Sequence, residues 1–327
     1  MVDFSTDYMG LTLRNPIVVS SSSLTSTVEK VQACERAGAG AVVLKSLFEE
    51  QILADTNQLI GAIDDTVHPE ARDLFNVSGK NYYMNEYLKL VREAKQRVSI
   101  PVIASVNCVS AGTWLEYASN FQDVGADAIE LNVFVMPADI SRSGPEIEQI
   151  YLDIAHSIKQ RIAIPVAMKI GSHFSGIAHM VQQLCGEGVD ALVLFNRFYR
   201  PDVDIENNKI VAADMLSTPQ EMALSLQWIA LLSGELKCDF SASTGIHDAT
   251  GVIKQLLVGA KTVQLCSVLF RNKMDYLQKI LTELQEWMQR HDHGSVRDFR
   301  GMLAQENIAR PELYERSQYI RALVGIS

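Results

Sequence analysis

Short runs of apolar, often β-branched residues recur along the chain, and a stretch with apolar residues at helical spacing follows each of them. The runs are apolar throughout, which is typical of strands in a parallel sheet that is covered on both faces. They are residues 16–20, 41–45, 101–106, 128–133, 165–170, 191–195, 239–243 and 262–266. The helical stretches are residues 27–37, 83–97, 113–123, 145–161, 176–186, 218–233, 249–258 and 275–290. Eight strand-then-helix units predict an α/β protein with a closed TIM (β/α)8 barrel.

Two connections between these units are long, namely residues 48–81 after the second strand and residues 197–216 after the sixth. Both leave the carboxyl end of a strand, which is the face where barrel enzymes build their active sites. Insertion without a function is the alternative interpretation of such loops. A doubly wound open sheet is the alternative to the barrel, but no G-x-G-x-x-G motif follows the first strand. We expect residues 1–327 to form a single barrel domain.

Composition and charge narrow the class of protein. The 327 residues are 47% hydrophobic and carry a net charge of -10, which argues against a general affinity for nucleic acid or anionic membranes. The 5 cysteines are widely spaced and form no C-x-x-C motif, so we expect neither a disulfide framework nor a zinc site. The N-terminus shows no signal-peptide pattern, and no stretch reaches the roughly 18 apolar residues of a membrane helix. We therefore expect a cytoplasmic protein that needs no metal.

Polar residues stand where the apolar strands end. Lys45 and Lys169 lie at the ends of the second and fifth strands, and Glu130 lies within the fourth. A lysine in an apolar strand must be paired or serve a ligand, because burying an unpaired charge is very costly. An ion pair with Glu130 inside the barrel is the alternative to a ligand site. Two lysines beside amides and hydroxyls on the same rim favour the ligand site.

The seventh and eighth strands end in Ser243-Thr244-Gly245 and Cys266-Ser267. Barrels of this kind often hold phosphate there, on backbone N–H groups near a helix N-terminus. Ordinary turns are the alternative explanation for these residues. His173 and His247 follow the fifth and seventh strands, and each is equally consistent with facing a ligand and with capping a loop.

In their order along the chain, these strand ends resemble the class 1 dihydroorotate dehydrogenase family, whose members are FMN-containing (β/α)8 barrels. The similarity covers essentially the whole sequence. The matching motifs are Asn15-Pro16 before Ser20-Ser21-Ser22, Lys45-Ser46, Asn76-Val77-Ser78-Gly79, Glu130-Leu131-Asn132, Lys169, Asn196, Leu216-Ser217-x-Pro219, Ser243-Thr244-Gly245-Ile246 and Cys266-Ser267.

The resemblance implies an FMN-dependent oxidation of dihydroorotate to orotate, a step of pyrimidine biosynthesis, with hydride transfer to flavin N5. A cation near flavin N1 would stabilise the anionic reduced flavin. The residues that would contact the flavin ring are Ser20, Ser21, Lys45, Ser46, Asn132 and Lys169. Those that would hold its phosphate are Thr244, Gly245, Cys266 and Ser267. Lys45 would also reach the substrate, together with Asn76, Ser78, Gly79, Asn196 and Arg197.

The sequence departs from the family in the loop that carries the catalytic base. Where the family has a cysteine or serine that removes a proton from dihydroorotate, this chain has Val135 or Met136, and neither accepts a proton. Arg197 replaces a serine of the family's substrate-binding pair. Losing a general base typically removes a factor of about 10²–10⁴ in rate. The substrate pocket is thus altered more than the flavin pocket.

Several functions follow from this departure. The first is dihydroorotate oxidation with a water, Ser141 or Ser143 in place of the base. The second is FMN chemistry on a different small molecule, and the third is a non-catalytic flavin-binding or flavin-free scaffold. Schiff-base chemistry at Lys169 is a further alternative, because a desolvated lysine can act as a nucleophile.

The partners expected are a small-molecule substrate and a soluble electron acceptor. No cysteine set for an iron–sulfur cluster is present, and no amphipathic N-terminal helix would dock a membrane quinone. The resemblance also implies a homodimer.

Overall fold

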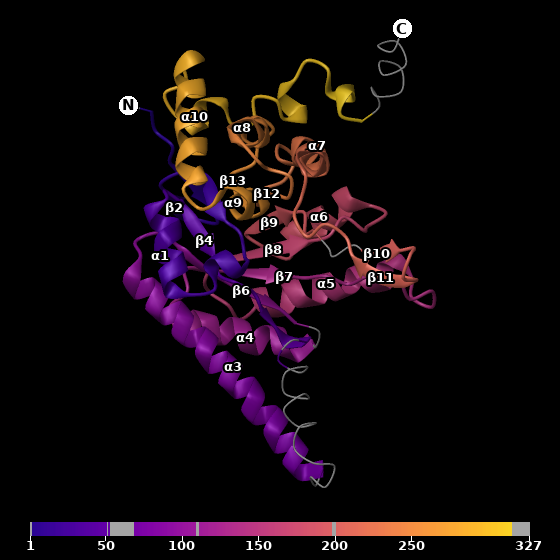
Figure 1. The fold of residues 1–327 in the computed structure, drawn as a ribbon. Coiled ribbons are helices and arrows are strands. Elements are labelled where there is room, and N and C mark those ends of the chain that lie inside the picture. Colours follow the sequence, from indigo (N-terminus) through magenta and orange to yellow (C-terminus); the bar gives the residue numbers. More distant parts are fainter. Residues whose placement is uncertain (1, 51, 53–68, 109–110, 198–200, 316–327) are drawn as a thin grey trace.

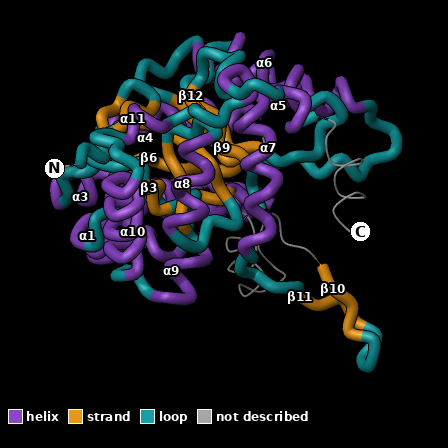
Figure 2. The backbone as a smooth tube through the Cα atoms, turned by 90° about the horizontal axis from the view of Figure 1, so that it is seen from above, coloured by secondary structure: helices purple, strands orange, loops and turns teal. Residues whose placement is uncertain are grey.

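The computed structural model describes residues 2–50, 52, 69–108, 111–197 and 201–315, without the side chains of residues 69–80 and 111. At its centre lies a barrel of parallel strands that helices enclose (Figures 1 and 2). The barrel strands are β3 (Ile17–Val19), β4 (Ala41–Val43), β6 (Val102–Asn107), β7 (Ala128–Asn132), β8 (Val166–Ile170), β9 (Ala191–Leu194), β12 (Asp239–Ser243) and β13 (Thr262–Leu265). Each matches one of the strands expected from the sequence, so the predicted barrel is confirmed and the open sheet is excluded.

The barrel closes where β4 pairs with β6, and the short strand β5 (Leu47–Phe48) extends this pairing along β6. The parallel register places Ser105 of β6 opposite Glu130 of β7, and Asn132 of β7 opposite Lys169 of β8. Side chains at paired positions of neighbouring strands point to the same face of a sheet. This register therefore brings the polar residues of these strands together inside the barrel.

The helices that cover the barrel follow their strands in order along the chain. They are α1 (Val28–Arg36), α3 (Pro69–Arg97), α4 (Ala111–Asp123), α5 (Gly144–Lys159), α6 (Ile177–Gly186), α7 (Met222–Leu232), α8 (Ala249–Leu257) and α10 (Tyr276–Arg290). Shorter helices are η1 (Ser23–Thr25), η2 (Pro219–Glu221), α9 (Ser267–Asn272), α11 (Val296–Phe299), η3 (Gln305–Asn307) and η4 (Pro311–Leu313). Their buried apolar faces pack on the outside of the barrel and form the larger part of the core.

An N-terminal hairpin closes the amino end of the barrel. It consists of the antiparallel strands β1 (Thr6–Tyr8) and β2 (Leu11–Leu13). The backbone N–H of Met9 donates to Asp239 Oδ2 at 2.8 Å, at the first residue of β12. The hairpin's apolar side chains form one buried cluster with small residues from the strands: Tyr8, Met9, Leu13, Val18, Ala41, Val43, Ile103, Ala128, Ala167, Ala191 and Val193. The amino-terminal half of the barrel interior is thus filled with apolar side chains.

The two long connections differ from simple loops. After β5, the chain is helical from Pro69 to Arg97, so the motif Asn76-Val77-Ser78-Gly79 lies in α3 and the prediction that it lies in a loop is wrong. The N-terminal end of α3 projects away from the barrel (Figure 1). The residue types of this motif favoured a loop. In the structure, its backbone N–H and C=O groups instead belong to a helix, where they hydrogen-bond within the helix itself.

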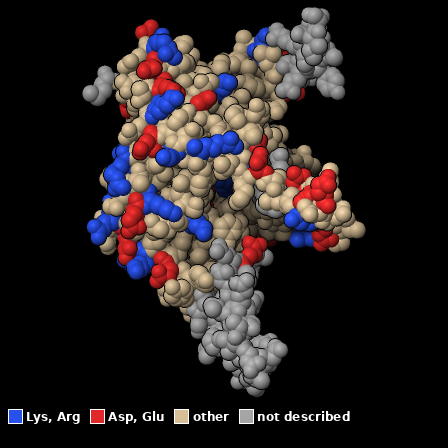
Figure 3. Space-filling view, viewed as in Figure 1, with Lys and Arg blue, Asp and Glu red and all other residues tan. Residues whose placement is uncertain are grey.

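The connection after β9 contains the antiparallel hairpin of β10 (Pro201–Asp204) and β11 (Lys209–Ala212). This hairpin projects from the body of the molecule (Figure 2), and acidic side chains gather on it (Figure 3). Val203 and Ile210 lie opposite each other on the two strands, and both are exposed. The hairpin is therefore held mainly by its own pairing.

Two sequence expectations about the chain as a whole meet different outcomes. Cys185, which follows Leu184 in α6, is joined to Cys238, which precedes β12, by a disulfide with a Cα–Cα distance of 5.7 Å. The expectation that the cysteines form no disulfide is wrong for this pair, because the fold brings together two residues that are 53 apart in sequence.

None of the helices in the described ranges is both long and apolar enough to cross a membrane.

Candidate active site

A cavity of about 170 Å³ opens at the carboxyl ends of β3, β8, β9, β12 and β13. Its walls bring together residues that the sequence analysis had assigned to the flavin with Asn196 and Arg197, which it had assigned to the substrate. They include Ser20, Ser21, Lys169, Asn196, Arg197, Ser243, Thr244, Gly245, Cys266 and Ser267, with Ser217 and Gln264 beside them. Residues more than 240 positions apart in sequence thus share one pocket because their strands end on the same rim.

Lys169 lies at the bottom of this cavity, and its side chain is almost fully buried. Its Nζ donates to Gln264 Oε1 at 3.3 Å and to Ser20 Oγ at 3.4 Å. Both acceptors are neutral, and among the described residues Lys169 forms no ion pair within 4.0 Å. The predicted alternative, an ion pair with Glu130, is therefore wrong, because Gln264 lies between the two groups. A buried ammonium held only by neutral groups favours an anionic ligand.

Glu130 sits below Lys169 in the barrel interior and is 1% exposed. Its Oε2 accepts from Gln264 Nε2 at 2.5 Å, whereas Oε1 has no hydrogen-bond partner in the described part of the chain. Burial raises the pKa of this carboxyl, although Lys169 and the hydrogen bond from Gln264 act in the opposite direction. The Gln264 side chain thus bridges a carboxyl and an ammonium through its two ends.

The end of the cavity near β12 and β13 is rich in hydrogen-bond donors. Thr244 and Gly245 both have φ in the left-handed region, at 75° and 78°, which is unusual for a β-branched residue. A Cβ on Gly245 would lie 2.2 Å from the backbone nitrogen of Met222, so glycine is required there. Ser217 joins this turn to α9, since its Oγ accepts from the Gly245 N–H at 3.3 Å and its own N–H donates to Ser267 Oγ at 2.9 Å. Such a turn holds N–H and O–H groups close together around a small anion.

His247 belongs to the same turn. Its Nε2 lies 3.2 Å from Ser217 Oγ, so it supports the cavity wall from behind. Burial and the nearby Arg271 lower the pKa of His247, which keeps its ring neutral at neutral pH. His173 instead lines a neighbouring cavity and packs near Phe134, with 6.2 Å between ring centroids.

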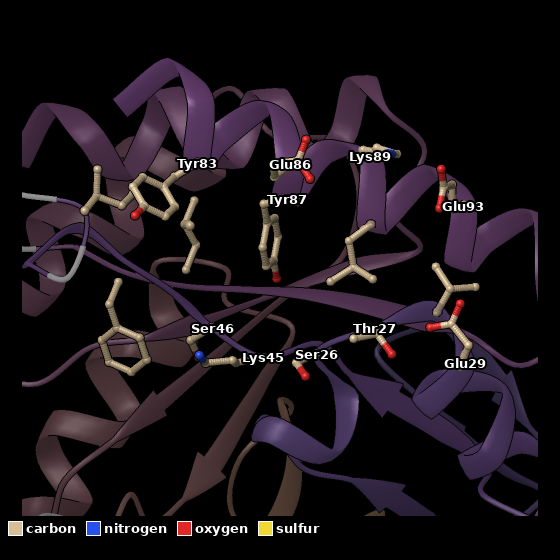
Figure 4. Close-up of a pocket in the computed structure, with 15 residues that line it drawn as sticks. Ser26, Thr27, Glu29, Lys45, Ser46, Tyr83, Glu86, Tyr87, Lys89 and Glu93 are labelled. Atoms are coloured by element: carbon tan, nitrogen blue, oxygen red, sulfur yellow. The ribbon is translucent and has the colours of Figure 1, made fainter. Parts of the chain in front are cut away.

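Three serines connect this cavity to a second one. Ser21 Oγ lies 2.9 Å from Ser46 Oγ, which lies 2.7 Å from Ser105 Oγ. Ser46 also lines a cavity of about 420 Å³ between α1, α3 and the segment after β4. Tyr87 points from α3 toward that segment (Figure 4), and its hydroxyl donates to the Ser105 carbonyl oxygen at 3.0 Å.

Lys45 lines this second cavity and not the first, and its side chain is exposed. The structure thus separates Lys45 from Lys169, although the sequence analysis had assigned both to the flavin. Asn76, Ser78 and Gly79 lie in the helical backbone of α3, and their side chains are outside the described set.

Asn196 and Arg197 follow β9 and line the first cavity. Asn196 Nδ2 donates to Asn132 Oδ1, which fixes both amides against each other. The Arg197 guanidinium donates to Glu221 Oε2 at 2.9 Å, to the Met215 carbonyl at 2.9 Å and to the Asp214 carbonyl at 2.8 Å. Arg197 therefore holds the segment that returns from the β10–β11 hairpin against the barrel rim.

The segment after β7 carries no proton acceptor at the expected base position. Val135 packs against the core, and its N–H donates to Tyr151 Oη at 2.9 Å. Met136 is half exposed and lines a third cavity, of about 820 Å³, which shares Asn196, Arg197, Ser243 and Thr244 with the first. Ser141 and Ser143 donate to the carboxylates of Asp139 and Glu146, each at 2.6 Å, and are exposed.

Sequence reasoning missed three residues that organise the site, namely Gln264, Ser105 and Glu221. Gln264 and Ser105 are polar positions in mainly apolar strands, and both point into the barrel. Gln264 lies two residues before Cys266. Alternation with a period of two along these strands is the signal that would have found them. In the described part of the chain, no group of three or more His, Cys, Asp or Glu residues is arranged to hold a metal ion.

Comparison with known proteins agrees with this geometry. Residues 4–288 match the family model for dihydroorotate dehydrogenase, so the chain belongs to this family of oxidoreductases and the predicted resemblance is confirmed. The catalytic subunit of dihydroorotate dehydrogenase B (NAD(+)) from Thermoplasma acidophilum is 25% identical over 309 residues, covering 92% of this chain and 99% of that protein.

Two further relatives differ in their named reactions. The putative dihydroorotate dehydrogenase A (fumarate) of Aeropyrum pernix is 23% identical over 306 residues, covering 91% of this chain and 97% of that protein. The chloroplastic dihydropyrimidine dehydrogenase (NADP(+)) of Arabidopsis thaliana is 20% identical over 347 residues, covering 97% of this chain and 80% of that protein. Relatives of similar identity thus carry names with different pyrimidines and different electron acceptors.

Proposed function

We propose that this chain is an FMN-dependent oxidoreductase that converts dihydroorotate to orotate, with FMN bound in the cavity above Lys169. The observation that carries the proposal is the buried ammonium of Lys169, which has only neutral hydrogen-bond partners. An anionic flavin ring provides the negative charge that these partners lack. Residues 1–327 act as a single catalytic domain in this proposal.

The donors around the cavity fit the two ends of FMN. A phosphate needs several N–H and O–H donors in a small space, and the turn at Thr244 and Gly245, with Cys266 and Ser267 opposite, supplies such a space. Gly245 also leaves room there that a side chain would fill. The flavin ring needs a cation near N1 and hydrogen-bonding groups along its edge, and the residues in reach are Ser20, Ser21, Ser46, Asn132 and Lys169.

When bound in this cavity, FMN would supply an acceptor for the substrate's hydride at its N5 atom. The protein orients the substrate beside it, and the amides of Asn196 and Asn132 are held for this purpose by their mutual hydrogen bond. In the proposal, Arg197 and the motif Asn76-Val77-Ser78-Gly79 also contact the substrate. Lys45 contacts the part of the substrate that extends over the barrel rim. The proton leaves to water, because neither Val135 nor Met136 accepts it.

We further propose that electrons leave to a soluble acceptor, that the protein forms a homodimer, and that it works in the cytoplasm. Relatives named for NAD(+) and for fumarate support a soluble acceptor. Size-exclusion chromatography with light scattering tests the dimer.

The visible absorption spectrum of the purified protein tests the function. Flavin bands that bleach when dihydroorotate is added without air are the expected result. A protein that is colourless and does not take up added FMN would contradict the proposal and support a flavin-free scaffold. Flavin bands that persist after dihydroorotate has been added would support FMN as the cofactor and contradict dihydroorotate as the substrate.

One observation favours a second function, which is the same flavin chemistry on a different small molecule with a reducible or oxidisable CH–CH bond. Val135 and Met136 stand where the resemblance predicts the base that assists dihydroorotate oxidation, and Met136 lines a large cavity next to the proposed flavin site. A relative named dihydropyrimidine dehydrogenase supports a related ring as substrate. Bleaching by dihydrouracil and not by dihydroorotate would favour this second function.

A further inference from the structure

A buried polar layer crosses the barrel directly beneath the proposed flavin site. It links Glu130 of β7, Gln264 of β13, Lys169 of β8 and Ser20 of β3. Gln264 occupies the centre, because its Nε2 donates to Glu130 at 2.5 Å and its Oε1 accepts from Lys169 at 3.3 Å and from Ser20 at 3.0 Å. If the Gln264 amide were flipped by 180°, its NH2 group would face the Lys169 ammonium, which is also a donor, so the amide has one orientation.

One oxygen atom in this polar layer lacks a hydrogen-bond partner within the described residues. Glu130 Oε1 is buried and has no hydrogen-bond partner among the described residues. An ionised carboxylate would leave part of its charge unsolvated there, whereas a neutral carboxyl loses much less on burial. The direction of the pKa shift agrees, since burial raises the pKa of Glu130 against the effects of Lys169 and Gln264.

The charged and titratable groups that face Glu130 come from several elements. Lys169 faces it from β8, Tyr87 from α3 and Tyr8 from the N-terminal hairpin. Burial raises the pKa of both tyrosines, so both hydroxyls are neutral at physiological pH. Lys169 is therefore the one charged group in this set, and its charge is partly cancelled only when Glu130 ionises.

We propose that Glu130 is a positioning residue which, as a neutral carboxyl acting through Gln264, holds Lys169 toward the flavin with its positive charge uncompensated. Ionisation of Glu130 places a negative charge below Lys169 and weakens its attraction for the negatively charged reduced flavin. The proton released in that step goes to the solvent. This inference rests on the proposed function, because it requires a flavin in the cavity.

The consequence is a link between pH and the flavin reduction potential. At low pH, Glu130 is neutral and the potential has its higher value. As pH rises through the pKa of Glu130, the potential falls more steeply than the flavin's own protonation requires. A purely structural Glu130 would give no such additional slope.

The experiment compares Glu130→Gln, Gln264→Met and Gln255→Met with the wild type, each loaded with FMN. Glu130→Gln mimics the neutral carboxyl, so it is expected to bind FMN like the wild type and to lack the additional slope in potential against pH. Gln264→Met removes the bridge, and the FMN dissociation constant is expected to rise about tenfold, as for loss of one hydrogen bond to a charged group. Gln255, which is also buried and donates to Ser225 Oγ at 2.9 Å, is the matched control and should leave both quantities unchanged.

A second readout needs no flavin. The infrared spectrum of the apoprotein at neutral pH should contain a band from a protonated carboxyl that is missing in Glu130→Gln. Absence of that band in the wild type, or an unchanged slope in Glu130→Gln, overturns the inference while FMN binding stands. Failure of the wild type to bind FMN overturns the proposed function and this inference together.

Discussion

On one side of the barrel mouth, the ends of β3, β8, β12 and β13 surround Lys169 with side chains that hydrogen-bond one another; we call this the β8–β13 side. On the other, which we call the β4–β7 side, the segments after β4 and β7 carry Lys45, Val135 and Met136. There Lys45 is exposed and Met136 is half exposed. The β8–β13 side carries the residue types that the resemblance to the dihydroorotate dehydrogenase family predicts, whereas the β4–β7 side has Val135 and Met136 where the resemblance predicts a proton acceptor.

The difference shows which part of the reaction the fold protects. A cofactor pocket made from strand ends is held in position by the register of the barrel. A substrate pocket made from long connections can change one residue at a time. The two sides therefore predict a retained cofactor and an altered substrate or base.

The largest expected effect comes from Gly245→Ala on the β8–β13 side. The added methyl would lie 2.2 Å from the Met222 nitrogen, and φ there is 78°, so the turn must move at a cost of about 1–3 kcal/mol or more. We expect a lower unfolding midpoint and loss of bound FMN, measured by thermal denaturation and flavin absorption. Gly112→Ala in α4 is the matched control, because its Cβ meets no atom within 4 Å. Full FMN retention in Gly245→Ala would show that this turn does not contribute to FMN binding.

Lys169→Ala is next. Removing a hydrogen-bonding cation from the flavin should cost about 1.5–3 kcal/mol, or roughly a 10–100-fold rise in the FMN dissociation constant, with a lower reduction potential. Titration of the apoprotein with FMN measures the first and spectroelectrochemistry the second. Lys159→Ala, which breaks the ion pair with Asp190 at 2.6 Å, serves as control. Equal affinity and potential in Lys169→Ala and wild type would refute the role of Lys169.

On the β4–β7 side, Met136→Cys should restore part of the missing function. Met136 lines the cavity beside Asn196, so a thiolate there can take the substrate proton, and we expect dihydroorotate oxidation to rise about tenfold. Val135→Cys should have no such effect, because Val135 packs against the core. Stopped-flow measurement of flavin bleaching distinguishes the two. If neither variant is faster, the site has a different substrate.

The smallest effect concerns His247, behind the turn at Thr244 and Gly245. Burial and Arg271 lower its pKa in the folded protein, while the unfolded chain takes up a proton near pH 6.5, about the value of a free histidine. The folded state is thus favoured above that pH, and this contribution is lost as pH falls below it. With His247→Gln, the unfolding temperature should fall slightly less between pH 7.5 and about pH 5 than it does in the wild type. An unchanged drop would show that His247 is not coupled to folding.

The same contrast explains what the sequence could predict. Strand ends such as Lys169, Thr244, Gly245 and Ser267 were found because the positions of parallel strands follow from their apolar runs. Gln264 was missed because a single glutamine in an apolar strand gives no motif, although its parity along β13 points it inward.

The β4–β7 side was less predictable for a physical reason. Residues 69–81 contain Gly79 and polar residues that favour a loop, yet they continue α3, because each residue added to an existing helix gains a backbone hydrogen bond and single-residue propensities are weak. Lys45 likewise has the parity of the barrel interior but faces the cavity under α3. Neither result follows from residues close in sequence.

The N-terminal hairpin closes the barrel at its amino end, whereas the carboxyl end opens into the cavity of Lys169. Tyr8, Met9 and Leu13 fill its amino end, so in the described part of the chain the polar layer at Glu130 opens toward the cavity of Lys169. A bound flavin would then act as a lid, and proton exchange of that layer with solvent would slow down when the cofactor is in place. The ionisation of Glu130 would therefore follow a change of pH more slowly in the protein with bound flavin than in the apoprotein.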